Sequence, residues 1–240
     1  MGYMEVTELL QEKLLLELPP VALSFVDEPP PDVLVMGKES PSLCTFWRWG
    51  ENAVFYASAE QHMGCLIGGM VAGFPLNAEQ MDEIQHLVDE LCPSDELPRD
   101  NASDVPKVSK QASGIVYGPL WRFPLQPDVV LFWATMVQAA VMQEVTQPLM
   151  WRGNPQGAYF ARPACSVLAI AMAHQHNAYS LGCVGMRAYT QIPSELGMLA
   201  VPGSQLEALE KGLATIEDPQ ARMQVYYDRI KAAQAAQTGD

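Results

Sequence analysis

The chain has 240 residues, of which 49% are apolar, and its formal net charge is −14. This length and apolar content allow a substantial buried core, which excludes an intrinsically disordered protein. The excess of acidic residues argues against binding to nucleic acid or to an anionic membrane, because phosphate groups would be repelled.

The start of the chain and its longest apolar stretches bear on location. Residues 1–18 contain acidic side chains and lack the positively charged start of a secretory signal. The longest apolar run, residues 129–145, is interrupted by glutamines and is too short to cross a bilayer. We therefore expect a cytoplasmic protein with reduced thiols and no membrane or nucleic-acid partner.

The first part of the chain predicts alternating helices and strands. Leu18-Pro19-Pro20 ends the first helix, and Ser42 is a suitable cap for a later one. The sequence Ser58-Ala59-Glu60-Gln61 resembles a capping box and predicts a helix that continues to Gly73. The predicted elements are a helix over 4–17, a strand over 21–26, a helix over 42–49, a strand over 54–57, and helices over 58–73 and 78–91.

The second part repeats this alternation after a polar segment. Residues 93–111 carry prolines and few apolar side chains, which predicts an exposed connection between two halves. The elements predicted after it are strands over 114–117, 129–133, 158–161, 179–181 and 199–202, and helices over 137–145, 163–173, 204–213 and 218–233. The pattern predicts an α/β protein, with mixed α+β as the alternative, in which residues 1–240 form a single domain with a weak internal pseudo-repeat.

Four of the five cysteines have duplicated surroundings. Cys44 and Cys183 each follow a Ser-Leu-(Gly) sequence and precede an arginine by four residues, Arg48 and Arg187 respectively. Cys65 and Cys165 each follow a short aromatic segment and open a stretch of small apolar residues. The segments 54–73 and 158–173 are therefore predicted to share one local structure and to be related by an approximate twofold axis.

Four thiolates can hold a zinc ion or an iron–sulfur cluster, because soft sulfur donors neutralise metal charge. The chain lacks the C-x-x-C pair that is typical of such sites, so the fold would have to gather distant ligands. Buried cysteines that pack as small apolar side chains are the alternative interpretation. Cys92, in an acidic loop before Pro93, is expected to lie outside the site.

The chain resembles a family of uncharacterised archaeal and bacterial proteins, domain of unknown function 169. Besides the cysteine segments, the resemblance is carried by Pro19-Pro20-Val21-Ala22, Gly118-Pro119-Leu120, Pro127-Asp128-Val129-Val130 and the run from Ser180 to Arg187. The resemblance implies cysteines at positions like Cys44, Cys65, Cys165 and Cys183. It implies no substrate.

Other residues near the cysteines are further candidates. Arg48 and Arg187 could supply positive charge beside thiolates, although pairing with surface carboxylates is the simpler expectation. Gly68 and Gly69 indicate close approach of another helix or of a ligand to the backbone. His62 precedes Cys65 by three residues and could act as a ligand or a base, and Cys165 lies near a helix start that would favour its thiolate.

The preferred hypothesis is that Cys44, Cys65, Cys165 and Cys183 hold an iron–sulfur cluster, or else a metal such as zinc, at a pseudo-twofold centre, with a redox partner. One alternative is a sensor that binds a small molecule in a metal-free pocket. Another is an enzyme with one activated cysteine. The sequence leaves catalytic activity and homo-oligomer formation open.

Overall fold

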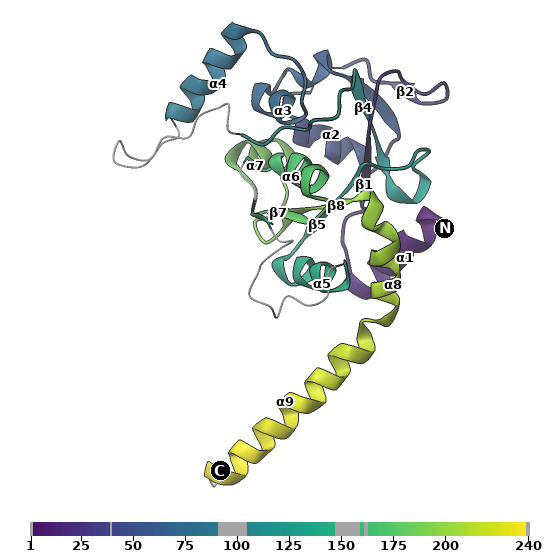
Figure 1. The fold of residues 1–240 in the computed structure, drawn as a ribbon, viewed down its shortest axis with the longest axis vertical. Coiled ribbons are helices and arrows are strands. Elements are labelled where there is room, and N and C mark those ends of the chain that lie inside the picture. Colours follow the sequence, from purple (N-terminus) through teal and green to yellow (C-terminus); the bar gives the residue numbers. More distant parts are fainter. Residues whose placement is uncertain (1, 39, 91–104, 147–158, 161–162, 239–240) are drawn as a thin grey trace.

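The computed structural model describes residues 2–38, 40–90, 105–146, 159–160 and 163–238. The strands are β1 (Val21–Val26), β2 (Leu34–Val35), β3 (Phe55–Ser58), β4 (Gly114–Pro119), β5 (Val129–Ala134), β6 (Tyr159–Phe160), β7 (Ala178–Ser180) and β8 (Gly197–Pro202). They form one mixed sheet in the order β2-β3-β4-β1-β5-β8-β7-β6 (Figure 1).

Helices cover both faces of this sheet. The α-helices are α1 (Tyr3–Leu14), α2 (Leu43–Gly50), α3 (Leu66–Val71), α4 (Ala78–Glu90), α5 (Met136–Thr146), α6 (Ser166–His174), α7 (Val184–Thr190), α8 (Leu206–Thr215) and α9 (Glu217–Thr238). Short 3-10 turns are η1 (Glu60–His62), η3 (Leu120–Arg122) and η5 (Gly203–Gln205). The prediction of an α/β fold is confirmed.

The strand order reads as two equivalent halves around a central pair. β1 and β5 are antiparallel neighbours at the centre. In one half β1, β4 and β3 are successively antiparallel and β2 joins β3 in parallel, while β5, β8, β7 and β6 pair in the same way in the other half. An approximate twofold axis therefore passes between β1 and β5 and relates the two halves, so the chain contains an internal repeat.

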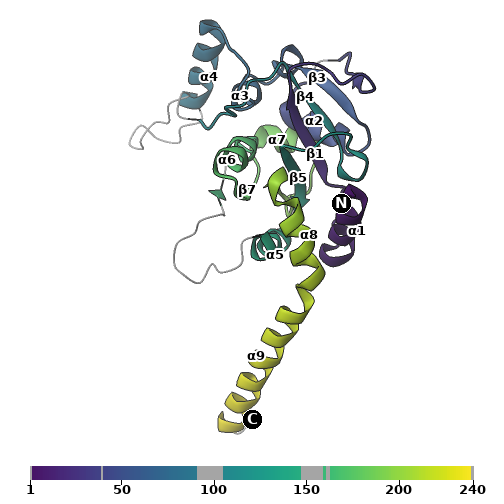
Figure 2. The same ribbon diagram turned by 45° about the vertical axis from the view of Figure 1, so that its right-hand side comes forward.

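Alternation along the strands divides the core into two layers. Val21, Leu23 and Phe25 of β1 pack on one face with side chains from α2, α3, α6 and α7. Ala22 points to the opposite face, where α1, α5 and α8 supply the apolar side chains. Figure 2 shows α1, α5 and α8 together, on the other side of β5 from α6 and α7. The predicted candidate cysteines all lie on the first of these faces.

The predicted helix over 58–73 is wrong, because the chain breaks inside it. Gln61 accepts a hydrogen bond from the backbone N–H of Ser58, as a capping box requires, but only the single turn η1 follows. Gly64 then lies so close to the carbonyl oxygen of Ser40 that an added Cβ would be 2.1 Å from it. The backbone turns there, and Cys65 caps a separate helix, α3.

Other boundaries also differ from the predictions. The first helix ends at Leu14 because Leu15 takes a left-handed conformation with a φ of 52°. β2 and α7 were not predicted, since two residues of β2 and seven of α7 are too short to show a period. Of the polar segment 93–111, residues 93–104 lie outside the described part.

Candidate cysteine site

Each of the four predicted cysteines lies at the start of a helix. Cys44 is the second residue of α2, whose cap Ser42 accepts a hydrogen bond from the backbone N–H of Thr45. Cys65, Cys165 and Cys183 are the N-cap residues of α3, α6 and α7. Sequence analysis had placed only Cys44 and Cys165 near helix starts.

The sheet order decides which cysteines correspond to each other. Cys44 lies between β2 and β3 and Cys165 between β6 and β7, so α2 is equivalent to α6. Cys65 follows β3 and Cys183 follows β7, so α3 is equivalent to α7. The same axis relates the contacts between the helices: α2 packs on α7, and the equivalent contact is that of α6 with α3.

This correspondence corrects the predicted pairing of segments. The predicted mates 54–73 and 158–173 do share the order strand, cysteine, helix, but β3 is the mate of β7, and β6 is the mate of β2. Likewise the mate of Cys44 is Cys165 and not Cys183. The wrong pairs were predicted because Cys44 and Cys183 each precede an arginine by four residues. This likeness is not part of the repeat, since the counterpart of Arg48 on α6 is Ala169.

A local signal for the true pairs exists in the sequence. Both half-buried cysteines occur in an apolar-Gly-Cys-apolar sequence, Met63-Gly64-Cys65-Leu66 and Leu181-Gly182-Cys183-Val184. In each, the cysteine Sγ accepts a 3.4 Å hydrogen bond from the backbone N–H three residues later. Both buried cysteines occur in an apolar-Cys-hydroxyl sequence, Leu43-Cys44-Thr45 and Ala164-Cys165-Ser166.

Neighbouring cysteines affect the ionisation of the two buried thiols, Cys44 and Cys165. Burial raises the pKa of the Cys44 thiol well above its ordinary value, and negative charge on Cys165, Cys183 and Cys65 raises it further. Burial likewise raises the pKa of Cys165, and charge on Cys65 and Cys183 adds to the effect. Without compensating positive charge, Cys44 and Cys165 are therefore protonated at neutral pH. Within the described part of the chain, no three His, Cys, Asp or Glu side chains are placed to hold a single metal ion.

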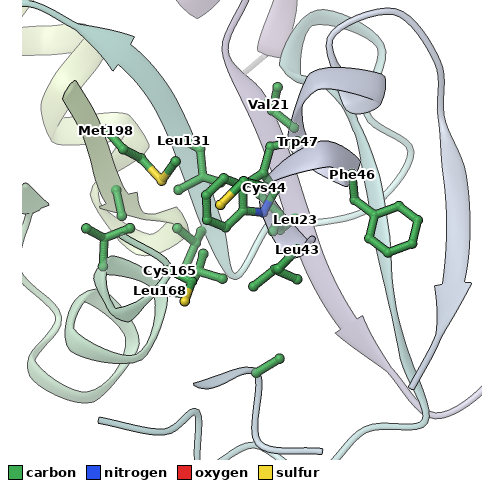
Figure 3. Close-up of a cluster of buried hydrophobic side chains, with 14 of the residues drawn as sticks. Val21, Leu23, Leu43, Cys44, Phe46, Trp47, Leu131, Cys165, Leu168 and Met198 are labelled. Carbon is green, nitrogen blue, oxygen red and sulfur yellow. The ribbon is translucent and has the colours of Figure 1, made fainter. Parts of the chain in front are cut away.

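Two buried polar groups beside these thiols lack partners. Among the described residues, neither Trp47 Nε1, on the turn after Cys44, nor Ser166 Oγ, next to Cys165, has a hydrogen-bond partner. The pseudo-symmetry explains Ser166: its counterpart Thr45 hydrogen-bonds to the Ser42 hydroxyl at 2.9 Å, whereas the counterpart of Ser42 is a proline. Figure 3 shows Cys44 with Trp47 and Cys165 with Leu168 in one apolar cluster.

Both candidate arginines contact protein groups. Arg48 forms an ion pair with the buried carboxylate of Glu51, which also accepts a 2.8 Å hydrogen bond from Trp133 Nε1. Burial raises the pKa of Glu51, although Arg48 and Trp133 act in the opposite direction. Arg187 donates to the carbonyl oxygens of Leu181, Ile192 and Pro193, and so holds the loops at both ends of α7.

His62 is a buried structural histidine. Its Nδ1 lies 2.6 Å from the carbonyl oxygen of Ser58, which can only accept, so Nδ1 carries the proton. Its Nε2 then accepts from the Tyr117 hydroxyl at 2.7 Å. Burial lowers the pKa of His62 to about 4, against the hydrogen bond to Ser58. With both ring nitrogens engaged, His62 is available neither as a ligand nor as a base.

Gly68 and Gly69 allow close packing around α3. A Cβ on Gly68 would lie 2.8 Å from Leu43 Cβ and 3.4 Å from Cys65 Sγ. A Cβ on Gly69 would lie 3.1 Å from the sulfur of Met63. These contacts are within the protein, and they bring the starts of α2 and α3 together beside Cys44 and Cys65.

Fold and site define an α/β protein with a pseudo-twofold sheet and four cysteines, two from each half, gathered on one face. The chain belongs to the family domain of unknown function 169, described as an uncharacterised conserved region (ArCR), whose model matches residues 9–212. The predicted membership is confirmed, and the match includes all four cysteines. No match was found among curated proteins or solved structures. In the described residues, no helix combines the length and apolar character needed to cross a membrane.

Proposed function

We propose that the protein holds an iron–sulfur cluster through Cys44, Cys65, Cys165 and Cys183 and exchanges electrons with a redox partner. The observation that carries the proposal is the pseudo-twofold convergence of four cysteine-bearing helix starts on one face of the sheet. Each half of the fold would supply one buried and one half-buried ligand.

Charge supports a metallic group at this place. The charges of neighbouring thiolates raise the pKa of Cys44 and Cys165 beyond the effect of burial, so four thiolates could coexist only beside strong positive charge. Iron ions supply that charge, and ligand binding would release the thiol protons. Cluster binding should therefore strengthen as the pH rises.

A cluster places weaker demands on the spacing of its cysteine ligands than a single zinc ion does. Tetrahedral zinc with bonds of ~2.3 Å requires its sulfur ligands to lie about 3.8 Å apart. No group within the described residues is gathered for a single ion. A cluster interposes several irons and sulfides between its cysteine ligands and so suits a wider arrangement.

The unpartnered Trp47 N–H and Ser166 O–H also support the proposal. A buried donor without a partner costs about 1–3 kcal/mol, a cost that cluster or thiolate sulfur would remove by accepting the hydrogen bond. Hydrogen bonds to sulfur raise the reduction potential of a cluster by stabilising its more negative state. Trp47→Phe should therefore make the midpoint potential more negative, and replacement of the exposed Trp121 by Phe should leave it unchanged.

The test is anaerobic reconstitution with iron and sulfide, followed by visible spectroscopy and analysis of iron and acid-labile sulfide. Serine replacement of each of the four cysteines should abolish or alter the spectrum, whereas Cys92→Ser should preserve it. A colourless reconstituted protein, or iron retained unchanged in all four variants, would contradict the proposal. If the protein instead contains stoichiometric zinc, the four cysteines bind a zinc ion and not a cluster. If an organic ligand co-purifies without metal, the result favours the metal-free pocket.

A further inference from the structure

The C-terminal helix α9 extends away from the body of the protein. It contains 22 residues, a length of ~33 Å, and runs outward beyond α8 (Figures 1 and 2). At its root, Lys13 Nζ of α1 lies 2.8 Å from the carboxylate of Glu217. Most of the stability of helices in proteins comes from packing, so such a projecting helix gains stability from a packing partner.

One face of α9 carries an exposed apolar stripe. Met223, Tyr226, Tyr227 and Ile230 are spaced i, i+3, i+4 and i+7, which places them side by side on a helix. Their exposed fractions are 42%, 55%, 49% and 36%. The rings of Tyr226 and Tyr227 contact each other edge to face, with centroids 5.3 Å apart. This stripe is suited to a second amphipathic helix.

The charges of α9 differ from those of the remaining chain. Residues 217–238 contain three acidic side chains, Glu217, Asp218 and Asp228, and three basic ones, Arg222, Arg229 and Lys231. Their formal charges cancel, so residues outside α9 carry the whole net charge of −14. Two copies of the chain therefore repel each other through their bodies but not through α9.

We propose that α9 forms an antiparallel pair with α9 of a second copy of this chain. The adjacent acidic residues Glu217 and Asp218 stand at the start of the helix, and Arg229 and Lys231 lie toward its end. With the two stripes overlapping, antiparallel pairing brings the acidic start of one helix toward Lys231 of the other and leaves one approach of like charges, between Arg222 and Lys231. Parallel pairing would place every charge beside its own copy. Antiparallel pairing also holds the two acidic bodies at opposite ends of the pair and creates a twofold, self-complementary interface.

This inference is independent of the cysteine site. The family match ends at residue 212, before α9 begins, so pairing would be a property of the segment added to the family region. Failure of cluster binding would leave the pairing unaffected, and the reverse also holds.

Sedimentation equilibrium of the full-length protein tests the proposal. The wild type should be a dimer, and the double variant Tyr226→Ser/Ile230→Ser should raise the dimer dissociation constant about tenfold or more, which corresponds to ~1.4 kcal/mol. Val225→Ser is the matched control, because Val225 is 51% exposed but lies off the stripe. Its dissociation constant should equal that of the wild type. A monomeric wild type, or an equally strong dimer in the double variant, would overturn the proposal.

Orientation is tested by zero-length carboxylate–amine cross-linking in dimers mixed from ¹⁴N- and ¹⁵N-labelled chains. A cross-link between Glu217 of one copy and Lys231 of the other is expected for the antiparallel pair. If a short amine-reactive reagent instead joins the two Lys231 side chains, the helices are parallel and the antiparallel arrangement is wrong.

Discussion

At the scale of single residues, burial divides the four cysteines into two pairs. Cys44 and Cys165 are buried with raised pKa values, and Cys65 and Cys183 are half-buried. The start of a helix was expected to favour the thiolate of Cys165. Burial opposes this effect, and it disfavours the thiolate more strongly than the backbone hydrogen bonds favour it. An enzyme that uses Cys165 as its one activated thiol is correspondingly disfavoured.

This division predicts an order of alkylation in the metal-free protein. Cys65 and Cys183 should react first and Cys44 and Cys165 later, because reaction requires both access and a thiolate. In the cluster-loaded protein, all four should be protected until the metal is removed. Timed alkylation with mass spectrometry measures the order, and fast labelling of Cys165 in the metal-free protein would contradict it.

The buried His62 predicts a specific loss of stability in acid. Its pKa is lowered from 6.5 to about 4, so its contribution is complete above pH 6.5 and is lost as the pH falls toward 4. The loss amounts to about 3 kcal/mol of unfolding free energy at 1.36 kcal/mol per pKa unit. His62→Gln, which can still bond to Ser58 and Tyr117, should remove this component of the pH dependence. Urea unfolding of both proteins between pH 7 and 4 measures it, and parallel curves would refute the assignment.

At the scale of elements, two helix glycines make a matched test of packing at the cysteine site. Gly68→Ala in α3 places a Cβ 2.8 Å from Leu43 Cβ and should destabilise the protein by about 1–3 kcal/mol. Gly185→Ala in α7 meets nothing within 4 Å and should stabilise it by up to about 1 kcal/mol through helix propensity. Chemical denaturation compares the two, and equal effects would mean that α2 and α3 are not closely packed.

Element boundaries also show where local patterns stop being informative. β1 was predicted at its observed bounds, Val21–Val26, because a proline pair precedes it and a turn follows. In contrast, α4 was predicted as an amphipathic helix, yet of the described residues in its apolar set only Ile84 is buried, and Leu87 remains 41% exposed. Periodicity predicted that this helix forms, but not that it stands at the margin of the core.

At the scale of the whole molecule, the proposed cluster would join the two halves of the sheet. Metal loading should raise the melting temperature, since a ligand that binds only the folded state stabilises it. Replacing the half-buried Cys65 or Cys183 by Ser should remove this increase while changing the metal-free melting temperature little. Calorimetry of the loaded and metal-free proteins measures both melting temperatures. If metal loading still raises the melting temperature in both variants, the metal is not held by cysteines from both halves of the sheet.

Family membership and the alternation of helices and strands were accessible from the sequence. They follow from spacing and composition that can be recognised within short segments of the sequence. The local patterns around Cys44 conflicted, and strand order decided that it corresponds to Cys165. Tertiary structure alone decided that Arg48 pairs with Glu51 and that the chain breaks before Cys65. These features depend on strand order, on burial and on the approach of Gly64 to Ser40, which are contacts between residues that local periodicity does not connect.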